Sequence, residues 1–200
     1  MIRARLALVA LLVFSFVSAL HAEDIPADEA AEWKAQMRER FLEWQQAPGK
    51  LDNVRFQLVT VGPGITVTTA FGHSAIRVLA GDAFGPNDYY VDFGEYDESM
   101  AFLWRFLRGN ARFYLNVVST GSAYEFWDSA ARGMLATELN LDSAAKSKLL
   151  DIIAMQLREQ TDGYEYDNYH SNCVTYIADV LSEATNEKVG LDAFDAGKVS

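Results

Sequence analysis

A single cysteine, Cys173, limits how this chain can be stabilised, because the chain begins like an exported protein. Exported proteins of modest size are commonly held together by disulfides. A lone cysteine has no partner in its own chain, so no internal disulfide can form. We therefore expect a fold that depends on its hydrophobic core. The thiol is then either a buried small apolar group or an unpaired reactive one.

Residues 1–22 have the pattern of a secretion signal. Arg3 and Arg5 precede an apolar run from Leu6 to Leu20, and the small residue Ala22 closes the segment. The apolar run is too short to span a membrane comfortably. We expect cleavage after it and a periplasmic location, and the alternative is retention as an anchor. No cysteine stands directly after the run, so the sequence carries no lipid attachment signal there.

Cleavage would leave 178 of the 200 residues and remove Arg3 and Arg5, which changes the net charge from −11 to −13. That length suits one domain with a sizeable core. The acidity argues against nucleic acid as a partner and against electrostatic docking to anionic lipid. The remaining histidines are His73 and His170. Two histidines and one cysteine do not predict a structural zinc site, and no metal or other cofactor is expected.

The hydrophobic pattern predicts an α+β domain. Apolar alternation and short apolar runs predict strands at 56–61, 71–79, 89–94 and 113–118, with a short extended piece at 139–141. Helical spacing predicts helices at 33–44, 99–108, 123–132, 143–162 and 173–184. The helix at 33–44 is expected to pack on the domain rather than to lie on a membrane face.

The expected organisation follows from these elements. It comprises a signal peptide at 1–22, an N-terminal helix at 23–50, a thiol-bearing domain at 51–188 and a C-terminal tail at 189–200. The sequence contains no internal repeat that would suggest a second domain.

Three residues have the chemistry of a thiol nucleophile with its base. Cys173 begins the predicted helix at 173–184, where the positive end of the helix dipole favours a thiolate. His73 follows Gly72 at the start of one strand, and Asp92 interrupts the apolar run of the next. If these two strands pair, Asp92 can orient the ring of His73 and leave its other nitrogen facing the sulfur.

Each strand residue also has a structural interpretation. His73 can be a hydrogen-bonded core histidine. Asp92 can form an ion pair with Arg77 or with Arg112 instead of orienting a base. The sequence leaves these alternatives open.

The residues around the thiol are equally open to two interpretations. Asn172 and the backbone N–H of Cys173 are candidate oxyanion donors, but Asn is also a common N-cap. His170 is expected to lie exposed in the preceding loop. Aromatic residues can line an acyl groove or form core, and core is the more common role for Phe102, Trp104, Phe106, Phe113, Tyr114, Phe126 and Trp127.

Several segments, in order, resemble the Lnb N-terminal periplasmic domain family. They are Phe71–Val78, Val91–Asp97, Arg108–Gly109 with Phe113–Leu115, Leu139–Leu141 before a helix, and Tyr164–Leu181. The resemblance covers roughly 55–186. The chain departs from the family pattern at Asp92, where the family tends to carry Asn, and at Ser171, where it usually carries Asp.

The resemblance implies a permuted papain-like fold related to NlpC/P60 amidases and lecithin:retinol acyltransferase. In that fold a small antiparallel sheet packs against helices, and the histidine strand precedes the cysteine helix. By this resemblance Cys173 is the nucleophile, His73 the base and Asp92 the orienting group. Candidate oxyanion-stabilising or substrate-binding residues are Asn172, Tyr166 and Arg77.

The function implied by the resemblance is thiol acyl transfer or acyl hydrolysis through an acyl-thioester on Cys173, linked to lipoprotein N-acylation. The expected partners are a phospholipid or lipoprotein acyl donor or acceptor, with an inner-membrane protein as a further candidate. One alternative is a cell-wall peptidase or amidase acting on peptidoglycan. Another is a binding module that keeps the fold without catalysis.

Overall fold

A computed structural model describes residues 27–47, 49, 51, 53–65, 69–70, 72–96, 99–159, 163–167 and 171–189. The predicted signal peptide, His170 and the tail beyond Val189 lie outside the described residues. The chain divides into two units, Met1–Trp33 and Lys34–Ser200, and the second carries the architecture described below.

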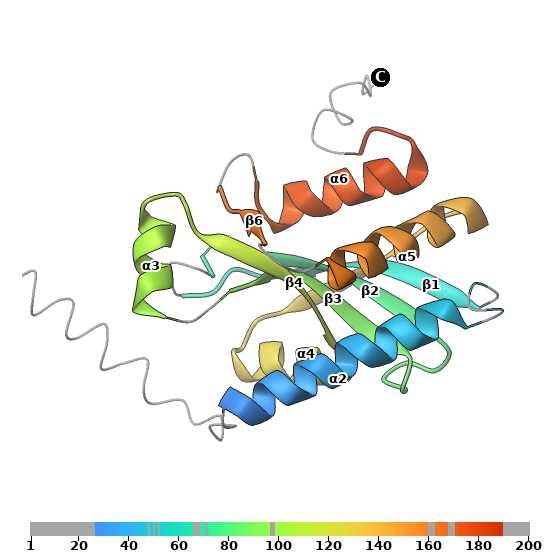
Figure 1. The fold of residues 1–200 in the computed structure, drawn as a ribbon, viewed down its shortest axis with the longest axis horizontal. Helices are drawn as coiled ribbons and strands as arrows, with labels where there is room; N and C mark the ends of the chain where they lie inside the picture. The colour runs from blue at the N-terminus through green and yellow to red at the C-terminus, as the bar shows by residue number, and fades with distance from the viewer. Residues whose placement is uncertain are drawn as a thin grey trace, which may run out of the picture. The chain divides into compact units, whose positions relative to one another are not determined.

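The second unit is built on one antiparallel sheet of six strands in the order β5-β1-β2-β3-β4-β6 (Figure 1). Each neighbouring pair is antiparallel. The strands are β1 (Val54–Val61), β2 (His73–Ala80), β3 (Asp88–Glu95), β4 (Arg112–Ser119), β5 (Met134–Leu139) and β6 (Tyr164–Glu165). β2 and β3 therefore lie side by side at the centre of the sheet.

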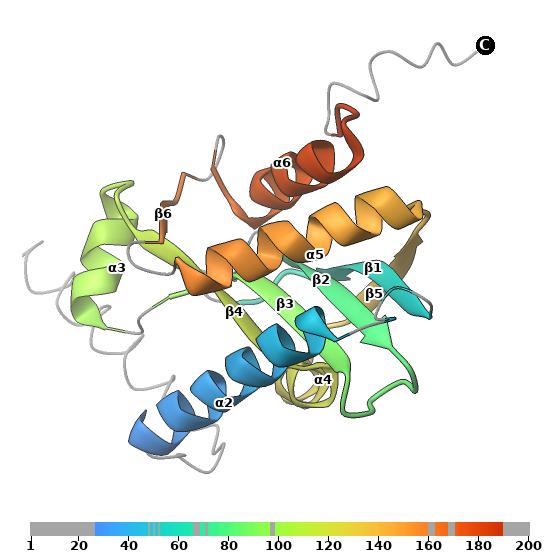
Figure 2. The same cartoon turned by 45° about the vertical axis from the view of Figure 1, so that its right-hand side comes forward.

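Helices cover both faces of the sheet. They are α2 (Ala27–Gln46), α3 (Met100–Leu107), α4 (Thr120–Ser129), α5 (Ser143–Arg158) and α6 (Cys173–Thr185). From Lys34 onward α2 lies with α5 and α6 on one face, whereas α4 lies on the other (Figures 1 and 2). The predicted α+β class, with a small antiparallel sheet packed against helices that include the cysteine helix, is confirmed.

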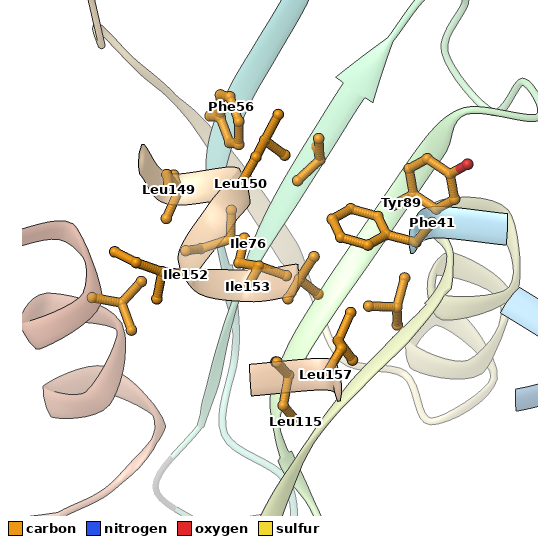
Figure 3. Packing of buried hydrophobic residues seen from close by; sticks show 14 of the residues in the cluster. Phe41, Phe56, Ile76, Tyr89, Leu115, Leu149, Leu150, Ile152, Ile153 and Leu157 are labelled. Carbon is orange, nitrogen blue, oxygen red and sulfur yellow. The ribbon is translucent and has the colours of Figure 1, made fainter. Parts of the chain in front are cut away.

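The larger core fills the space between the sheet and the face covered by α2, α5 and α6. Leu149, Leu150 and Ile153 of α5 are fully buried there against strand residues such as Phe56 and Ile76 (Figure 3). Phe41 of α2 packs edge-on against Tyr89 with ring centroids 5.1 Å apart.

The packing of α2 agrees with its predicted role as part of the domain. Met37 and Phe41 are both buried in the larger core. Within the described residues, no helix combines the length and apolar character needed to cross a membrane.

The opposite face carries a smaller core beneath α4. Val59, Ala75 and Tyr90 are buried there with Ala123, and Trp127 packs against them. Strand alternation explains this division, because Ala75 points to the α4 face while its neighbours Ser74 and Ile76 point to the other. His73 and Asp92 share the parity of Ala75 and Tyr90, so their side chains belong to the α4 face.

Several elements differ from the prediction at their ends. α2 begins at Ala27 and not at 33, and α5 ends at Arg158 and not at 162. β5 begins at Met134, whereas only 139–141 was expected to be extended. It is an edge strand with four exposed residues between half-buried ends, so its sequence carries no apolar alternation to recognise. α4 begins at Thr120, three residues before the predicted start, because the Ser119 side chain caps it by accepting the N–H of Ser122.

Candidate functional site

His73 and Asp92 meet across the central pair of strands. β2 and β3 align Ala75 opposite Asp92, so Asp92 lies diagonally across from His73 on the same face. Nε2 of His73 lies 2.9 Å from Oδ1 of Asp92. This contact acts chiefly as an ion pair, because the charge of Asp92 raises the pKa of His73 more than its hydrogen bonding does.

Gly94 holds the Asp92 carboxylate and makes room for the ring. Its N–H donates to Oδ1 of Asp92 at 2.6 Å. A Cβ at position 94 would lie 2.6 Å from Cε1 of His73 and 3.2 Å from Nδ1. The pairing of β3 with β4 shifts register between Asp92 and Glu95, and such irregularities often re-aim side chains beside active sites.

Cys173 is the first residue of α6, directly after the N-cap Asn172. The Asn172 side chain accepts the N–H groups of Val174 and Thr175, and the Thr175 hydroxyl accepts the N–H of Asn172. This capping box fixes where the helix begins. The thiol is half-buried and is a free cysteine.

The Cys173 side chain lies within hydrogen-bonding reach of the His73 ring. Burial by itself lowers the pKa of His73, but the Asp92 carboxylate and the Cys173 side chain outweigh burial and raise the pKa to about 10. With Nε2 taken by Asp92, Nδ1 is the nitrogen left to face the sulfur. The ring is therefore a cation at neutral pH between two groups that favour its charge.

Trp127 and Tyr90 form the wall of the site on the α4 side. The ring centroids of His73 and Trp127 are 5.4 Å apart. The Trp127 indole N–H donates to the Tyr90 hydroxyl at 3.2 Å. On the far side of Trp127, the guanidinium carbon of Arg132 lies 4.5 Å from the indole centroid, and its Nε donates to the Gly62 carbonyl at 2.8 Å.

An aromatic cluster adjoins the thiol. It consists of Phe102, Phe106, Ala111 and Phe113, with Tyr96, Tyr164 and Tyr166 packed against them. Burial raises the pKa of Tyr166 to about 12, with the Cys173 side chain as the next cause. Burial and then Cys173 also raise the pKa of Tyr164, whose hydroxyl donates to the Phe93 carbonyl at 2.7 Å. The two tyrosines of the cluster therefore lie within electrostatic range of the sulfur.

The structure brings together four of the predicted site residues, and it gives Arg77 another partner. Cys173, His73, Asp92 and Tyr166 are neighbours, and Asn172 caps the cysteine helix. Arg77 donates from Nε and Nη2 to the two carboxylate oxygens of Asp88, at 2.8 and 2.6 Å.

Asp88 is a structural anchor. Its side chain is fully buried and also accepts from the Thr120 hydroxyl and from the Phe84 N–H, each at 2.6 Å. Burial raises its pKa, but the bonds from Arg77, Thr120 and Phe84 outweigh burial and lower it. The alternative in which Asp92 pairs with Arg77 is wrong, because Asp88 occupies that guanidinium. His170 lies outside the described residues.

Gly94, Trp127 and Arg132 lie at or beside the site but were not predicted to do so. Gly94 had a visible signal, since a glycine two residues after the acid interrupts a strand and permits a close approach. For Trp127 the sequence predicts a position in the core or in a groove, and no pattern in the neighbouring residues predicts its contact with His73. Among the described residues, no group of three or more His, Cys, Asp or Glu side chains converges as a metal site would require.

Residues 40–197 match the family model of the Lnb N-terminal periplasmic domain. The chain belongs to the Lnb N-terminal periplasmic domain family. No curated protein and no solved structure matches it.

Membership of the Lnb N-terminal periplasmic domain family confirms the resemblance seen in the sequence. The match includes His73, Asp92 and Cys173. A family of periplasmic domains also agrees with the export expected from residues 1–22, while cleavage stays a prediction. Asp92, where the family tends to carry Asn, is the residue whose side chain faces Nε2 of His73. The difference from the family pattern therefore lies in direct contact with the candidate base.

The charge of His73 in this Lnb N-terminal periplasmic domain is directly measurable. We expect both ring nitrogens to stay protonated from pH 6.5 until the pH approaches about 10. Nitrogen-detected NMR of a histidine-labelled sample should report this, and Asp92→Asn should shift the transition to lower pH. Because folding raises the pKa of His73, protonation of the ring stabilises the folded protein. This contribution to the free energy of unfolding is complete below pH 6.5 and is lost as the pH rises through about 10. A His73 transition near pH 6.5 in the folded protein would contradict the ion pair.

Proposed function

We propose that this domain is a cysteine-dependent acyltransferase or acyl hydrolase. In this proposal Cys173 is the nucleophile, His73 is the base and proton carrier, and Asp92 orients His73. The observation that carries it is the convergence of the three side chains from α6, β2 and β3, with the His73 ring between the sulfur and the carboxylate. A nucleophile, a base and a group that orients the base make up the usual set for covalent catalysis.

The first half-reaction forms an acyl-thioester. His73, whose raised pKa keeps the ring protonated at neutral pH, stabilises a thiolate at Cys173 in this step. The sulfur attacks the carbonyl carbon of an ester, a C–S bond forms, and the carbonyl oxygen becomes an oxyanion. The C–O bond then breaks, and His73 gives its proton to the departing alkoxide, which leaves as an alcohol.

The oxyanion needs a donor close to the sulfur. The first N–H groups of an α-helix have no partner within the helix. In α6 the Asn172 side chain takes those of Val174 and Thr175, and its carbonyl takes that of Tyr176. Among the described hydrogen bonds, the N–H of Cys173 is the first-turn donor that remains, so we assign it the oxyanion; the helix cap uses Oδ1 of Asn172, which can only accept.

The second half-reaction releases the acyl group. A primary amine or a water molecule attacks the thioester carbonyl and passes its proton to His73. The C–S bond breaks and the sulfur leaves as a thiolate beside the protonated ring, which restores the starting state. An amine yields an amide and water yields a carboxylic acid, so the acceptor decides between transfer and hydrolysis.

The surroundings of the sulfur favour an acyl substrate over a polar peptide. Tyr164 and Tyr166 of the aromatic cluster lie within electrostatic range of Cys173, and the phenylalanines of the cluster are each at most 9% exposed. These rings are packed against one another and offer no exposed surface themselves, but they make the environment near the sulfur apolar, which suits a hydrocarbon chain better than a polar peptide. For the same reason the peptidoglycan amidase is the weaker candidate.

Intact-mass spectrometry after incubation with a phospholipid donor tests this proposal. We expect the mass of one acyl chain to be added to the wild-type protein, to be released by neutral hydroxylamine, and to be absent from Cys173→Ala. A parallel digestion of muropeptides serves as the comparison. Digestion of muropeptides without any acyl adduct would replace the proposal with the amidase. An adduct that persists in Cys173→Ala, or a Cys173 that reacts with neither donor, would refute the nucleophile.

A further inference from the structure

α3 is apolar around almost its whole circumference, although one side faces solvent. Seven of its eight residues are apolar, and Arg105 is the exception. Phe102 and Phe106 face the aromatic cluster and are 6% and 9% exposed, whereas Trp104 and Leu107 are 58% and 61% exposed. A helix that is apolar all round is normally buried in a core or in lipid. The outer side of α3 therefore has the composition of a contact surface.

The C-terminal end of this helix is basic in an otherwise acidic chain. The net charge of the chain is −11, yet residues 99–124 contain three arginines and no aspartate or glutamate. Arg105 and Arg108 are exposed at the end of α3, and the guanidinium carbon of Arg108 lies 4.8 Å from the Trp104 ring centroid. The third, Arg112, lies on β4 opposite the acidic residue Glu165 of β6 and is not part of this surface.

A second group of exposed aromatic residues provides a contrast. Tyr124 and Phe126 of α4 are 47% and 59% exposed. On α4, however, the exposed neighbours are the acidic residues Glu125 and Asp128. The two surfaces therefore have similar apolar exposure and opposite charge. Only the α3 surface complements an anionic partner.

The α3 surface lies at the same end of the domain as the thiol. The inner side of α3 packs through Phe106 on Tyr166, with ring centroids 5.6 Å apart, and Tyr166 in turn lies within electrostatic reach of Cys173. Both views place β6 between α3 and the beginning of α6 (Figures 1 and 2). A surface that binds α3 would therefore meet the domain beside its candidate nucleophile.

We propose that the outer face of α3, formed by Trp104, Arg105, Leu107 and Arg108, docks on the surface of a bilayer that contains anionic phospholipid. Tryptophan, leucine and arginine are the side chains that favour the membrane interface, where an aromatic ring sits at headgroup level and a guanidinium meets phosphate. The acidity of the whole chain argued against such docking. Because salt screens charges beyond about 8 Å, the local arginines decide the interaction at the contact.

Vesicle co-sedimentation of the protein purified from the periplasm tests the docking face. We compare mixed phosphatidylcholine and phosphatidylglycerol vesicles with pure phosphatidylcholine vesicles at several salt concentrations. Binding should require the anionic lipid and weaken with salt. Arg105→Gln with Arg108→Gln should lower the partition coefficient about 25-fold, at about fivefold for each arginine. Trp104→Ser with Leu107→Ser should lower it about tenfold or more.

A matched control comes from the other end of the sheet. Leu135 is 65% exposed and the Arg55 side chain is 57% exposed, so Leu135→Ser with Arg55→Gln removes similar groups elsewhere. This control and Cys173→Ala should bind like wild type, which separates docking from the proposed chemistry. Equal loss in the control, or equal binding to both vesicle types, would overturn the proposal. So would sedimentation-velocity data in which Trp104→Ser with Leu107→Ser dissolves a dimer and leaves vesicle binding unchanged.

Discussion

His73→Gln is expected to slow acylation of Cys173 by about 10²–10⁴-fold, the range in which a positioned acid–base group contributes. Glutamine has a comparable length but cannot carry the proton. It removes the cation that stands between the sulfur and Asp92, so the sulfur loses its charged partner and the leaving alkoxide loses its proton donor. The rate is measured under single-turnover conditions, with an activated ester as the donor and intact mass as the readout.

A second readout makes the His73 result independent of the acyl donor. Alkylation of Cys173 by iodoacetamide at neutral pH should slow about tenfold or more in His73→Gln, because the thiolate is the reacting form. Asp92→Asn should have a smaller effect on both rates, since the ring stays in place while its pKa falls. Thermal unfolding confirms that the variants are folded. If folded His73→Gln reacts at the wild-type rate in both assays, His73 is not the catalytic base.

Gly94→Ala is expected to lower the acylation rate by about 10²-fold while leaving the protein folded, the cost that a misplacement of about 1 Å can carry. The new Cβ would lie 2.6 Å from Cε1 of His73 and 3.3 Å from Oδ1 of Asp92, so the ring must move. The backbone of Gly94 is not in the left-handed region, so alanine strains the packing rather than the chain. The stability cost expected for such overpacking is about 1–3 kcal/mol.

Gly133→Ala is the matched control for Gly94→Ala. A Cβ at Gly133 meets no atom within 4 Å, and the residue precedes β5. Its rate and stability should equal those of wild type. Because Gly94 acts through His73, the histidine pKa in Gly94→Ala should also shift, which a general loss of stability would not produce. An unaltered His73 resonance together with a normal acylation rate would show that the ring tolerates a side chain at position 94.

Local sequence signals were sufficient for most elements of the fold. The apolar runs at 56–61 and 89–94 correspond to β1 and β3, because a strand covered on both faces is apolar along its length. The helical spacing from Cys173 onward corresponds to α6, because this helix buries one regular face. β5 escaped prediction because an exposed edge strand has no buried face to impose a pattern. The contact between His73 and Asp92 was predictable as well, since the two residues lie on consecutive strands and their side chains fall on the same face when those strands pair.

The contacts that individual side chains make were harder to predict from the sequence. Arg77 seemed available to a substrate, yet it binds Asp88, which is eleven residues later on the next strand. That ion pair depends on the register of β2 against β3 and on the burial of Asp88, and no short stretch of sequence predicts either. Trp127 reaches His73 only because α4 crosses the sheet on the side that carries the histidine.

Residue types and their spacing were enough to identify an exported α+β domain with one thiol, one candidate base and one acid, because hydrophobic period and helix-start chemistry act over a few residues. The packing of the chain brings Cys173 against His73, places the His73 ring against the backbone of Gly94, and turns Arg105 and Arg108 of α3 outward. These depend on contacts between segments far apart in sequence, and such contacts exist only once the sheet has closed against its helices.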